Sequence, residues 1–398
     1  MPHDVSRRSF LKSAAAVGAF AASAGAAPKE KPIQGFEDTA SNTVKDKVWV
    51  PVSDRKVRVG IVGYGLCKFG AAFGFQDHPN VEVVAVSDLF PDRCAELARA
   101  CRCEKTYPSL EELVKDRRIE AVFLATDAPS HCRHCIEVLK HGKHAASAVP
   151  AVFGSLEDAE RLYKAVKFSG LNYMMFETSA FRDDCHAMRK VYRAGGFGEL
   201  VYSEGEYFHY LEKPLDSYKE WRKGCPPLWY PTHSTAYHVC VSGGAFTEVS
   251  CCGMPSHLEY LKREKNAYKN TFGTEIALLR TTEGGMARML MSKDTPGHNG
   301  EVGRVRGQKG SMTGTAYDGT VDISALELAK PPLPPGVAAG GHGGSHGYLC
   351  DEFITSILQE RTPLVNIAWA LNMTVAGIVA HASALKDGET LKVPHYKF

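Results

Sequence analysis

The sequence predicts an α/β fold in which a doubly wound parallel sheet is followed by an α+β domain with a largely antiparallel, open sheet. One observation is the regular alternation of short apolar strands with helices that begins at residue 56. A second is the change in residue pattern after about residue 180, where apolar and polar residues alternate and aromatic side chains are frequent. Short apolar strands between helices build a parallel sheet covered on both faces, whereas alternation is typical of antiparallel strands with one covered face.

The elements of the first domain are assigned from their apolar runs. Lys56–Val62 is rich in valine and ends at glycines, Pro91–Cys101 has proline at a helix start, and Leu156–Phe168 carries apolar residues at helical spacing. The other predicted strands are Val81–Val86, Ile119–Ala125, Lys143–Ala148 and Leu171–Phe176, and the other predicted helix is His131–His141.

The second domain is predicted to combine long strands with two closing helices. The strands are Leu200–Tyr210, Thr274–Arg280, Met286–Met291 and Gly310–Ala316. A loop rich in proline and glycine, Pro331–Gly347, precedes the predicted helices Tyr348–Gln359 and Ile367–Leu385.

Composition and charge exclude several classes of protein. The 398 residues are 44% hydrophobic and 23% charged, which excludes a disordered, collagen-like or coiled-coil chain. With 47 Lys and Arg against 45 Asp and Glu, the net charge is +2, and no electrostatic binding of nucleic acid is indicated. The apolar run from Ser13 to Ala27 is shorter than the roughly 20 residues that span a bilayer, so no stable membrane insertion is expected.

The N-terminus has the pattern of an export signal. Ser6-Arg7-Arg8-Ser9-Phe10-Leu11-Lys12 precedes a weakly apolar stretch and small residues near Ala26, and this resembles the twin-arginine signal. We therefore expect a signal peptide at 1–28, a linker at 29–55, and a folded chain exported to the periplasm by the twin-arginine machinery. We place the first domain at residues 56–178 and the second domain at residues 179–398. The second domain is expected to serve substrate binding and oligomerisation, and its C-terminal helices can pack against the first domain.

The twelve cysteines do not predict a metal site. Their close pairs do not repeat with zinc-ribbon spacing. The cluster His131-Cys132-Arg133-His134-Cys135 has ligand-type residues, but consecutive residues of a helix point to different faces, so we predict no metal there. Disulfides are compatible with an oxidising compartment, and the sequence does not pair them.

A glycine turn after the first strand predicts a dinucleotide site. Gly63-Tyr64-Gly65-Leu66 lies between a strand and a helix, where glycine allows the backbone to approach a pyrophosphate. The third glycine of the full fingerprint is replaced by Lys68. Asp88 ends the next strand 25 residues after Gly63, and a carboxylate there accepts hydrogen bonds from ribose hydroxyls and repels a 2′-phosphate. NAD is therefore the predicted cofactor, and a tight turn with a structural aspartate is the alternative.

The order of elements and motifs resembles the glucose–fructose oxidoreductase/inositol dehydrogenase (Gfo/Idh/MocA) family over residues 56–390. The stretches that carry the resemblance are VRVGIVGYG, VVAVSD, AVFLATDAPSH, GKHAASAVP and GGFGELVYSEGEY. The resemblance implies a Rossmann-type first domain, and it implies that Thr126, His131 and Ala148 line the nicotinamide side of the cofactor site. It also implies a homo-oligomer.

Two departures separate this chain from the dehydrogenases of that family. Their Glu-Lys-Pro is Ala148-Val149-Pro150 here, and valine cannot assist proton removal from a substrate hydroxyl. The aspartate of the later Asp-x-Gly-x-His motif is also missing, since the segment ends in Tyr230-Pro-Thr-His233. His233 stands ten residues before Gly243, which matches the position of the family's catalytic histidine.

Where it departs from the dehydrogenases, the chain resembles the NAD-dependent glycosidase branch of the family, typified by α-N-acetylgalactosaminidase. The matching motifs, in order, are Met174-Met175-Phe176-Glu177, Arg182-Asp183, Phe197-Gly198-Glu199, Tyr207-Phe208-His209, Trp221-Arg222, the segment at 230–233 and Gly-Gly-His-Gly-Gly at 340–344. In that branch, a ketone formed at C3 acidifies the C2 proton, the aglycone is eliminated, water adds, and the ketone is reduced again.

Site residues are assigned on this basis. His233 is the predicted base, because imidazole titrates near neutrality, and Tyr230 is the predicted proton relay. Beside the glycine turn and Asp88, the predicted cofactor contacts are Thr126, His131, Ala148 and Glu177. The predicted substrate contacts are Arg182, His209, Trp221 and His342; solvated-strand, loop, packing or salt-bridge roles are the respective alternatives.

The sequence thus predicts an NAD-dependent enzyme that transfers hydride at a ring carbon of a sugar or glycoside, with tightly bound and recycled NAD. Net oxidoreduction is the first interpretation, redox-neutral glycoside hydrolysis is the alternative, and a non-catalytic carbohydrate-binding protein is a further alternative. Export favours a recycled cofactor, because a periplasmic enzyme meets no replenished nicotinamide pool.

Overall fold

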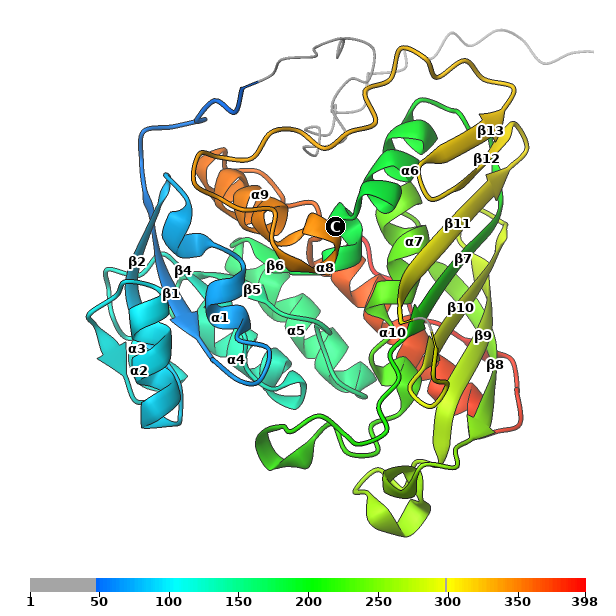
Figure 1. Cartoon of the computed structure of the whole chain (residues 1–398), viewed down its shortest axis with the longest axis horizontal. Coiled ribbons are helices and arrows are strands. Elements are labelled where there is room, and N and C mark those ends of the chain that lie inside the picture. The colour runs from blue at the N-terminus through cyan, green and yellow to red at the C-terminus, as the bar shows by residue number, and fades with distance from the viewer. Residues whose placement is uncertain (1–47, 298) are drawn as a thin grey trace, which may run out of the picture. The chain divides into compact units, whose positions relative to one another are not determined.

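The computed structural model describes residues 48–297 and 299–398, and the elements below lie within these ranges (Figure 1). The predicted signal peptide at 1–28 and the linker up to residue 47 lie outside the described residues. Two sheets organise the described chain, and the strands of the first all precede those of the second. The predicted fold class is confirmed.

The first sheet has six parallel strands in the order β3-β2-β1-β4-β5-β6. Its central strands are apolar runs whose side chains are almost wholly buried, as expected when helices cover both faces. The strands are β1 (Val57–Val62), β2 (Val81–Ser87), β3 (Thr106–Tyr107), β4 (Ala121–Leu124), β5 (His144–Ser147) and β6 (Tyr173–Met175).

Helices connect these strands, which gives the doubly wound topology. Ser109 and Ser155 cap two of them, each accepting a hydrogen bond from a backbone N–H in the first turn. The helices are α1 (Phe69–Ala72), α2 (Pro91–Ala100), α3 (Leu110–Leu113), α4 (His131–Lys140) and α5 (Leu156–Ser169).

The second sheet has eight strands in the order β13-β12-β11-β7-β10-β9-β8-β14. All neighbouring pairs are antiparallel except β7 and β10, which run parallel at the centre of the sheet. The strands are β7 (Leu200–Phe208), β8 (Phe246–Pro255), β9 (Phe272–Thr281), β10 (Met286–Ser292), β11 (Gly300–Gly307), β12 (Gly310–Thr313), β13 (Ala316–Gly319) and β14 (Leu391–Lys392).

The sequence prediction differs from this sheet in two ways. The segment Gly310–Ala316 was expected to be one strand, but Gly314 has a positive φ of 60° and turns the chain, so β12 and β13 form a hairpin. Strands β8, β11 and β14 were not predicted. β11 contains three glycines between charged residues, and such a sequence has little intrinsic strand preference.

One face of the second sheet is covered by helices, and the opposite face is left open. The covering helices are α6 (Asp183–Arg193), α7 (Thr232–Ser242) and α10 (Ile367–Ala384) (Figure 1). The short helix α8 (Gly341–Gly344) lies within the segment Pro331–Gly347 that was expected to be a loop, and α9 (His346–Leu358) begins at the end of that segment. By length and composition α10 is apolar enough to cross a membrane, but 94% of its apolar window is buried inside the fold, as in a core helix.

Two glycines bring α7 close to the sheet. A Cβ at Gly205 of β7 would lie 2.0 Å from the carbonyl oxygen of Ser234, and one at Gly303 of β11 would lie 1.8 Å from the ring of Tyr237. No side chain fits at either position unless α7 moves. The close approach fixes the start of α7, where His233 is located.

We expect the substitution Gly205→Ala to lower the free energy of unfolding by at least about 1–3 kcal/mol, because the added methyl group clashes with backbone that cannot rotate away. The measurement is urea unfolding followed by circular dichroism. Val201→Ala, at an exposed position of the same strand, is the control and should cost less than about 1 kcal/mol. Equal losses in the two variants would contradict the close approach.

Candidate active site

A pocket of about 340 Å³ lies between the carboxyl ends of the first sheet and the helix-covered face of the second sheet. Ligands of open α/β sheets bind at this end of the strands. The pocket is lined by Cys67, Phe69, Phe73, Ala148, Val149, Phe176, Thr178, Tyr207, His209, Leu211, Leu215, Trp221, Arg222, Cys225, Tyr230, His233, Met291, Lys293 and His342.

The predicted glycine turn has the shape that a pyrophosphate requires. Gly63 has a φ of 101°, and a Cβ there would lie 2.4 Å from the carbonyl oxygen of Ala125. A Cβ at Gly65 would meet nothing within 4 Å, so the space above the turn is open. Helix α1 is a single turn with a small dipole, so the loop amides would hold the phosphates.

Asp88 lies beside the turn, as predicted. Its Oδ2 accepts a hydrogen bond from the N–H of Tyr64 at 2.7 Å, and its Oδ1 accepts one from the N–H of Phe90 at 2.9 Å. Each carboxylate oxygen keeps a second lone pair, which a ribose hydroxyl can occupy. These residues therefore fit NAD: the turn would hold the pyrophosphate and Asp88 the adenosine ribose. Leu66 is 58% exposed beside them.

The polar groups of Thr126 and His131 contact other residues of the first domain. The ring of His131 is buried, with Nδ1 2.8 Å from the carbonyl oxygen of Pro150 and Nε2 3.1 Å from that of Thr126. The Oγ1 of Thr126 is 2.9 Å from Nδ1 of His134. His131 thus ties together the loops after β4 and β5, and neither it nor Thr126 lines the pocket, whereas Ala148 does.

His233 is the histidine of the pocket whose pKa is raised, whereas the pKa values of His209 and His342 are lowered. Its Nδ1 donates a hydrogen bond to Oε1 of Glu177 at 2.8 Å and lies 3.9 Å from Oε1 of Glu301. Burial by itself lowers the pKa of His233, but the two carboxylates outweigh burial and raise that pKa to about 9. Since Nδ1 is engaged, Nε2 is the ring atom left for a ligand.

The side chain of Glu177 contacts His233 and lies outside the lining of the pocket. It was predicted to contact the cofactor, but its side chain is fully buried, and its Oε1 also accepts a hydrogen bond from the N–H of Ser179. Although burial raises its pKa, the charge and hydrogen bond of His233 dominate and hold the pKa of Glu177 below its usual value. The structure therefore gives Glu177 the task of orienting His233.

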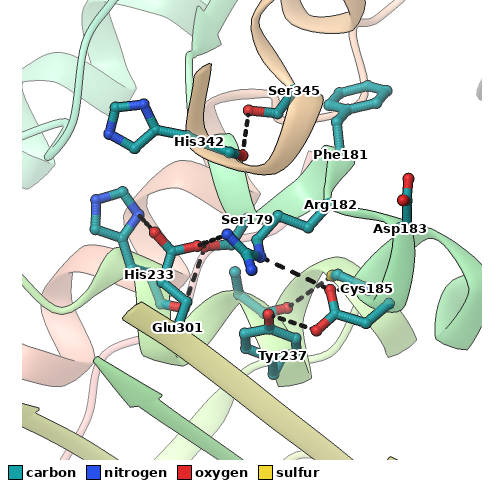
Figure 2. A network of polar contacts seen from close by, with 12 residues as sticks. Ser179, Phe181, Arg182, Asp183, Cys185, His233, Tyr237, Glu301, His342 and Ser345 are labelled. Carbon is teal, nitrogen blue, oxygen red and sulfur yellow. Dashed lines mark hydrogen bonds and ion pairs between the residues drawn. The ribbon is translucent and has the colours of Figure 1, made fainter. Parts of the chain in front are cut away.

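A second carboxylate, Glu301, was missed by sequence reasoning. Its Oε2 accepts a hydrogen bond from Oγ of Ser179 at 2.9 Å and lies 3.5 Å from Nη1 of Arg182 (Figure 2). Glu301 shares the buried face of β11 with Gly303 and Val305, and an acidic residue on a buried strand face is the signal that could have found it. Arg182, predicted to contact substrate, lies behind the pocket and holds Glu301 instead.

Aromatic rings surround His233 in the pocket. The ring centroid of Tyr207 is 4.7 Å from that of His233, and His209 stacks on Tyr207 at 5.6 Å. Tyr230 is 5.6 Å from His233, and burial raises its pKa to about 12. The hydroxyl of Tyr230 therefore keeps its proton at neutral pH and is available as a donor.

The predicted substrate residues Trp221 and His342 line the same pocket as His209. Trp221 packs edge-on against Phe153 at 5.4 Å. Nδ1 of His342 is 2.9 Å from Nε2 of His346, and burial lowers the pKa of both rings. Within the described part of the chain, no group of three or more His, Cys, Asp or Glu side chains could hold a metal ion, and this includes the cluster at the start of α4.

Comparisons with known proteins agree with this geometry. Residues 57–177 match the model of the GFO_IDH_MocA family, described as an oxidoreductase family with an NAD-binding Rossmann fold. This range contains the glycine turn, Asp88 and Glu177.

The chain is also similar to curated proteins named for glycosyl hydrolase family 109. The protein 1 of that name from Bacteroides fragilis (strain YCH46) is 29% identical over 39% of this chain, and the match spans about a third (35%) of the relative's length. The protein from Solibacter usitatus (strain Ellin6076) is 24% identical over 98% of this chain and 97% of the relative.

Solved structures share the fold over both sheets. Levoglucosan dehydrogenase in complex with NADH and levoglucosan superposes with a TM-score of 0.69 at 17% identity, covering 86% of this chain and 100% of that one. An oxidoreductase domain protein from Kribbella flavida gives a TM-score of 0.69 at 18% identity, with 86% and 100% covered.

We expect the substitution Glu177→Gln to lower the pKa of His233 from about 9 toward the ordinary histidine value of about 6.5. A neutral amide no longer stabilises the imidazolium, so His233 loses its proton at a lower pH. The measurement is the titration of the His233 ring carbon by NMR. Glu283→Gln is the control, because Glu283 pairs with His238 at 3.3 Å outside the pocket. An unchanged His233 titration in Glu177→Gln would contradict the pairing.

We expect Asp88→Asn to lower the affinity for NAD about 10- to 100-fold, because the ribose hydroxyls lose a charged acceptor. The measurement is the amount of NAD that stays with the purified chain and the dissociation constant on adding it back. Asp92→Asn, an exposed aspartate at the start of α2, should leave both unchanged. Equal NAD content in all three proteins would remove Asp88 from the cofactor site.

Proposed function

We propose that this chain is a redox-neutral, NAD-dependent glycosidase of the Gfo/Idh/MocA oxidoreductase family, whose NAD-binding model matches residues 57–177. The observation that carries the proposal is the buried pair of His233, which lines the pocket, with Glu177; Cys67, just after the cofactor turn, lines the same pocket. The similarity to proteins named for glycosyl hydrolase family 109 supports it, most broadly the Solibacter usitatus relative, which aligns over nearly the whole length of both chains.

The residues of the pocket suit proton transfer at a sugar hydroxyl. Bound NAD supplies a reversible hydride acceptor, held by the glycine turn and Asp88. In its neutral form His233 takes the hydroxyl proton at Nε2, while Glu177 holds the proton on Nδ1 and stabilises the imidazolium that results. Because the pKa of His233 is about 9, the neutral form is the minor one at pH 7, and we expect turnover to rise as the pH rises toward 9. Tyr230, whose pKa is about 12, keeps a proton that it can donate to a departing oxygen.

The absence of a lysine beside the cofactor argues against a simple dehydrogenase. Val149, at the position of the expected lysine, lines the pocket, and its side chain carries no proton to exchange. The lysine that does line the pocket, Lys293, follows β10 of the second sheet and donates to the carbonyl oxygen of Cys225 at 2.7 Å. Proton transfer is therefore assigned to His233.

Net oxidation of a sugar, the first interpretation from the sequence, is the second candidate. The same His233 and the same cofactor site would serve it, and the family includes oxidoreductases. The two candidates differ in outcome: net oxidation accumulates NADH or needs an acceptor sugar, whereas the glycosidase cycle does neither. A non-catalytic sugar-binding protein would bind ligand without any turnover.

Export belongs to the proposal as well. The basic segment Ser6–Lys12 supports twin-arginine transport to the periplasm, and a cofactor that returns to its starting state suits a compartment without a nicotinamide pool. Cell fractionation of the native chain and of Arg7→Lys, Arg8→Lys tests the route. The proposed homo-oligomer is tested by light scattering.

The main experiment measures nitrophenolate release from nitrophenyl α- and β-glycosides by the purified protein without added NAD. We expect release on at least one sugar, and we expect His233→Ala to lower kcat by at least about 100-fold because the proton acceptor is lost. The exposed His257→Ala is the matched control and should keep full activity.

Two results would decide against the proposal. If no glycoside of the panel releases nitrophenolate and NADH forms from a free sugar, net oxidation is favoured. Full activity in His233→Ala removes that residue from the mechanism.

A further inference from the structure

Two cationic side chains, Lys293 and Arg222, line the pocket. Lys293, which follows β10, is 7% exposed, and its Nζ donates a hydrogen bond to the carbonyl oxygen of Cys225. Arg222 lies over the ring of Trp221, with its guanidinium carbon 4.2 Å from the ring centroid, and 5.8 Å from the ring centroid of Tyr230. Stacking on two rings holds the guanidinium in a fixed position.

Neither cation forms a salt bridge with a carboxylate in the described part of the chain. The neighbouring acidic side chains have other partners: Asp294 accepts a hydrogen bond from Thr274 at 2.7 Å, and Glu275 is 2.5 Å from Nδ1 of His381. A buried ammonium group without a counter-ion is costly, since the loss of hydration is not repaid. An anionic group supplied by a ligand would repay it.

The other titratable groups of the pocket do not fill this role. None of the residues that line the pocket is an aspartate or a glutamate. Burial lowers the pKa of His209 and of His342, so both rings are neutral near pH 7. The positive charge of His233 is matched by Glu177 and Glu301 behind it. Lys293 and Arg222 therefore give the part of the pocket that they line a positive charge.

The second sheet places Lys293 beside Tyr207 and His233. Tyr207 pairs with Met291 across β7 and β10, and the backbone N–H of Leu211 donates to the carbonyl oxygen of Lys293 at 2.8 Å. Lys293 is thus the second residue after the partner of Tyr207, whose ring contacts His233. The predicted pyrophosphate turn belongs to the other sheet, after β1.

We propose that Lys293 and Arg222 bind an anionic substituent of the substrate, so that the enzyme acts on acidic sugars whose ring carries a carboxylate or a sulfate ester. That such a sugar is a substrate rests on the proposed function, whereas the binding of its anionic group rests on the pocket alone. A planar guanidinium pairs with two oxygens of such a group, and the ammonium adds a point charge.

The experiment measures binding calorimetrically with the NAD-loaded protein. The probes are galactose, galacturonate and galactose 6-sulfate, with glucose and glucuronate as a second series. We expect at least one acidic sugar to bind about 10- to 100-fold more tightly than its neutral counterpart, and this preference to fall as salt is added. Comparing the two acidic galactose derivatives distinguishes a carboxylate from a sulfate ester.

Variants test the residues directly. Lys293→Met should abolish the preference for the acidic sugar while leaving affinity for the neutral sugar within about threefold, and Lys293→Arg should retain most of it. Arg222→Gln is a second, independent variant, and Lys265→Met, an exposed lysine outside the pocket, is the control. Melting curves and NAD content establish that each variant is folded and loaded.

The outcomes separate this inference from the proposed function. Tight binding of an acidic sugar without any glycoside cleavage supports the charged subsite and counts against the glycosidase. Equal affinities for acidic and neutral sugars overturn the subsite, even if neutral glycosides are cleaved. Loss of NAD in Lys293→Met, with sugar preference unchanged, also overturns it, because the anion would then be the cofactor's phosphate.

Discussion

The hydrogen bond between Nδ1 of His233 and Oε1 of Glu177 is the interaction on which the site depends. Glu177 follows the last strand of the first sheet, and His233 begins α7 on the second sheet, so this bond joins the two halves of the pocket. It forms only because α7 approaches β7 at Gly205, where no other residue fits. Packing in the second domain thus sets the geometry of a group beside the cofactor.

The electrostatic environment explains how a charged histidine can be buried here. Glu177 and Glu301 both face Nδ1, and Arg182 balances the second carboxylate from the far side. Opposite charges at these distances offset the lost hydration of the imidazolium. The pocket itself remains free of acidic side chains, because both carboxylates lie behind His233. While it is protonated, His233 presents a positive charge to the ligand, and it acts as a base only after it has lost the proton on Nε2.

Local patterns in the sequence were enough to predict the fold and part of the site. The turn at Gly63 and the carboxylate of Asp88 are recognisable because their roles follow from strand, turn and strand in immediate succession. Glu301 and Lys293 were not predicted, since Glu301 reaches His233, and Lys293 the pocket, only through pairing within a second sheet whose register the sequence does not specify. Glu177 was recognised as a site residue, but its contact with His233 depends on two domains coming together.

The central claim is that the reaction is redox-neutral and removes a proton from a ring carbon of the sugar. The most direct measurement is turnover of a cleavable glycoside in D₂O, with the released sugar analysed by NMR and NADH followed by its absorbance. The account predicts one deuterium at C2 for each molecule of sugar released and no build-up of NADH. Released sugar without deuterium, or NADH formed in proportion to product, would contradict it.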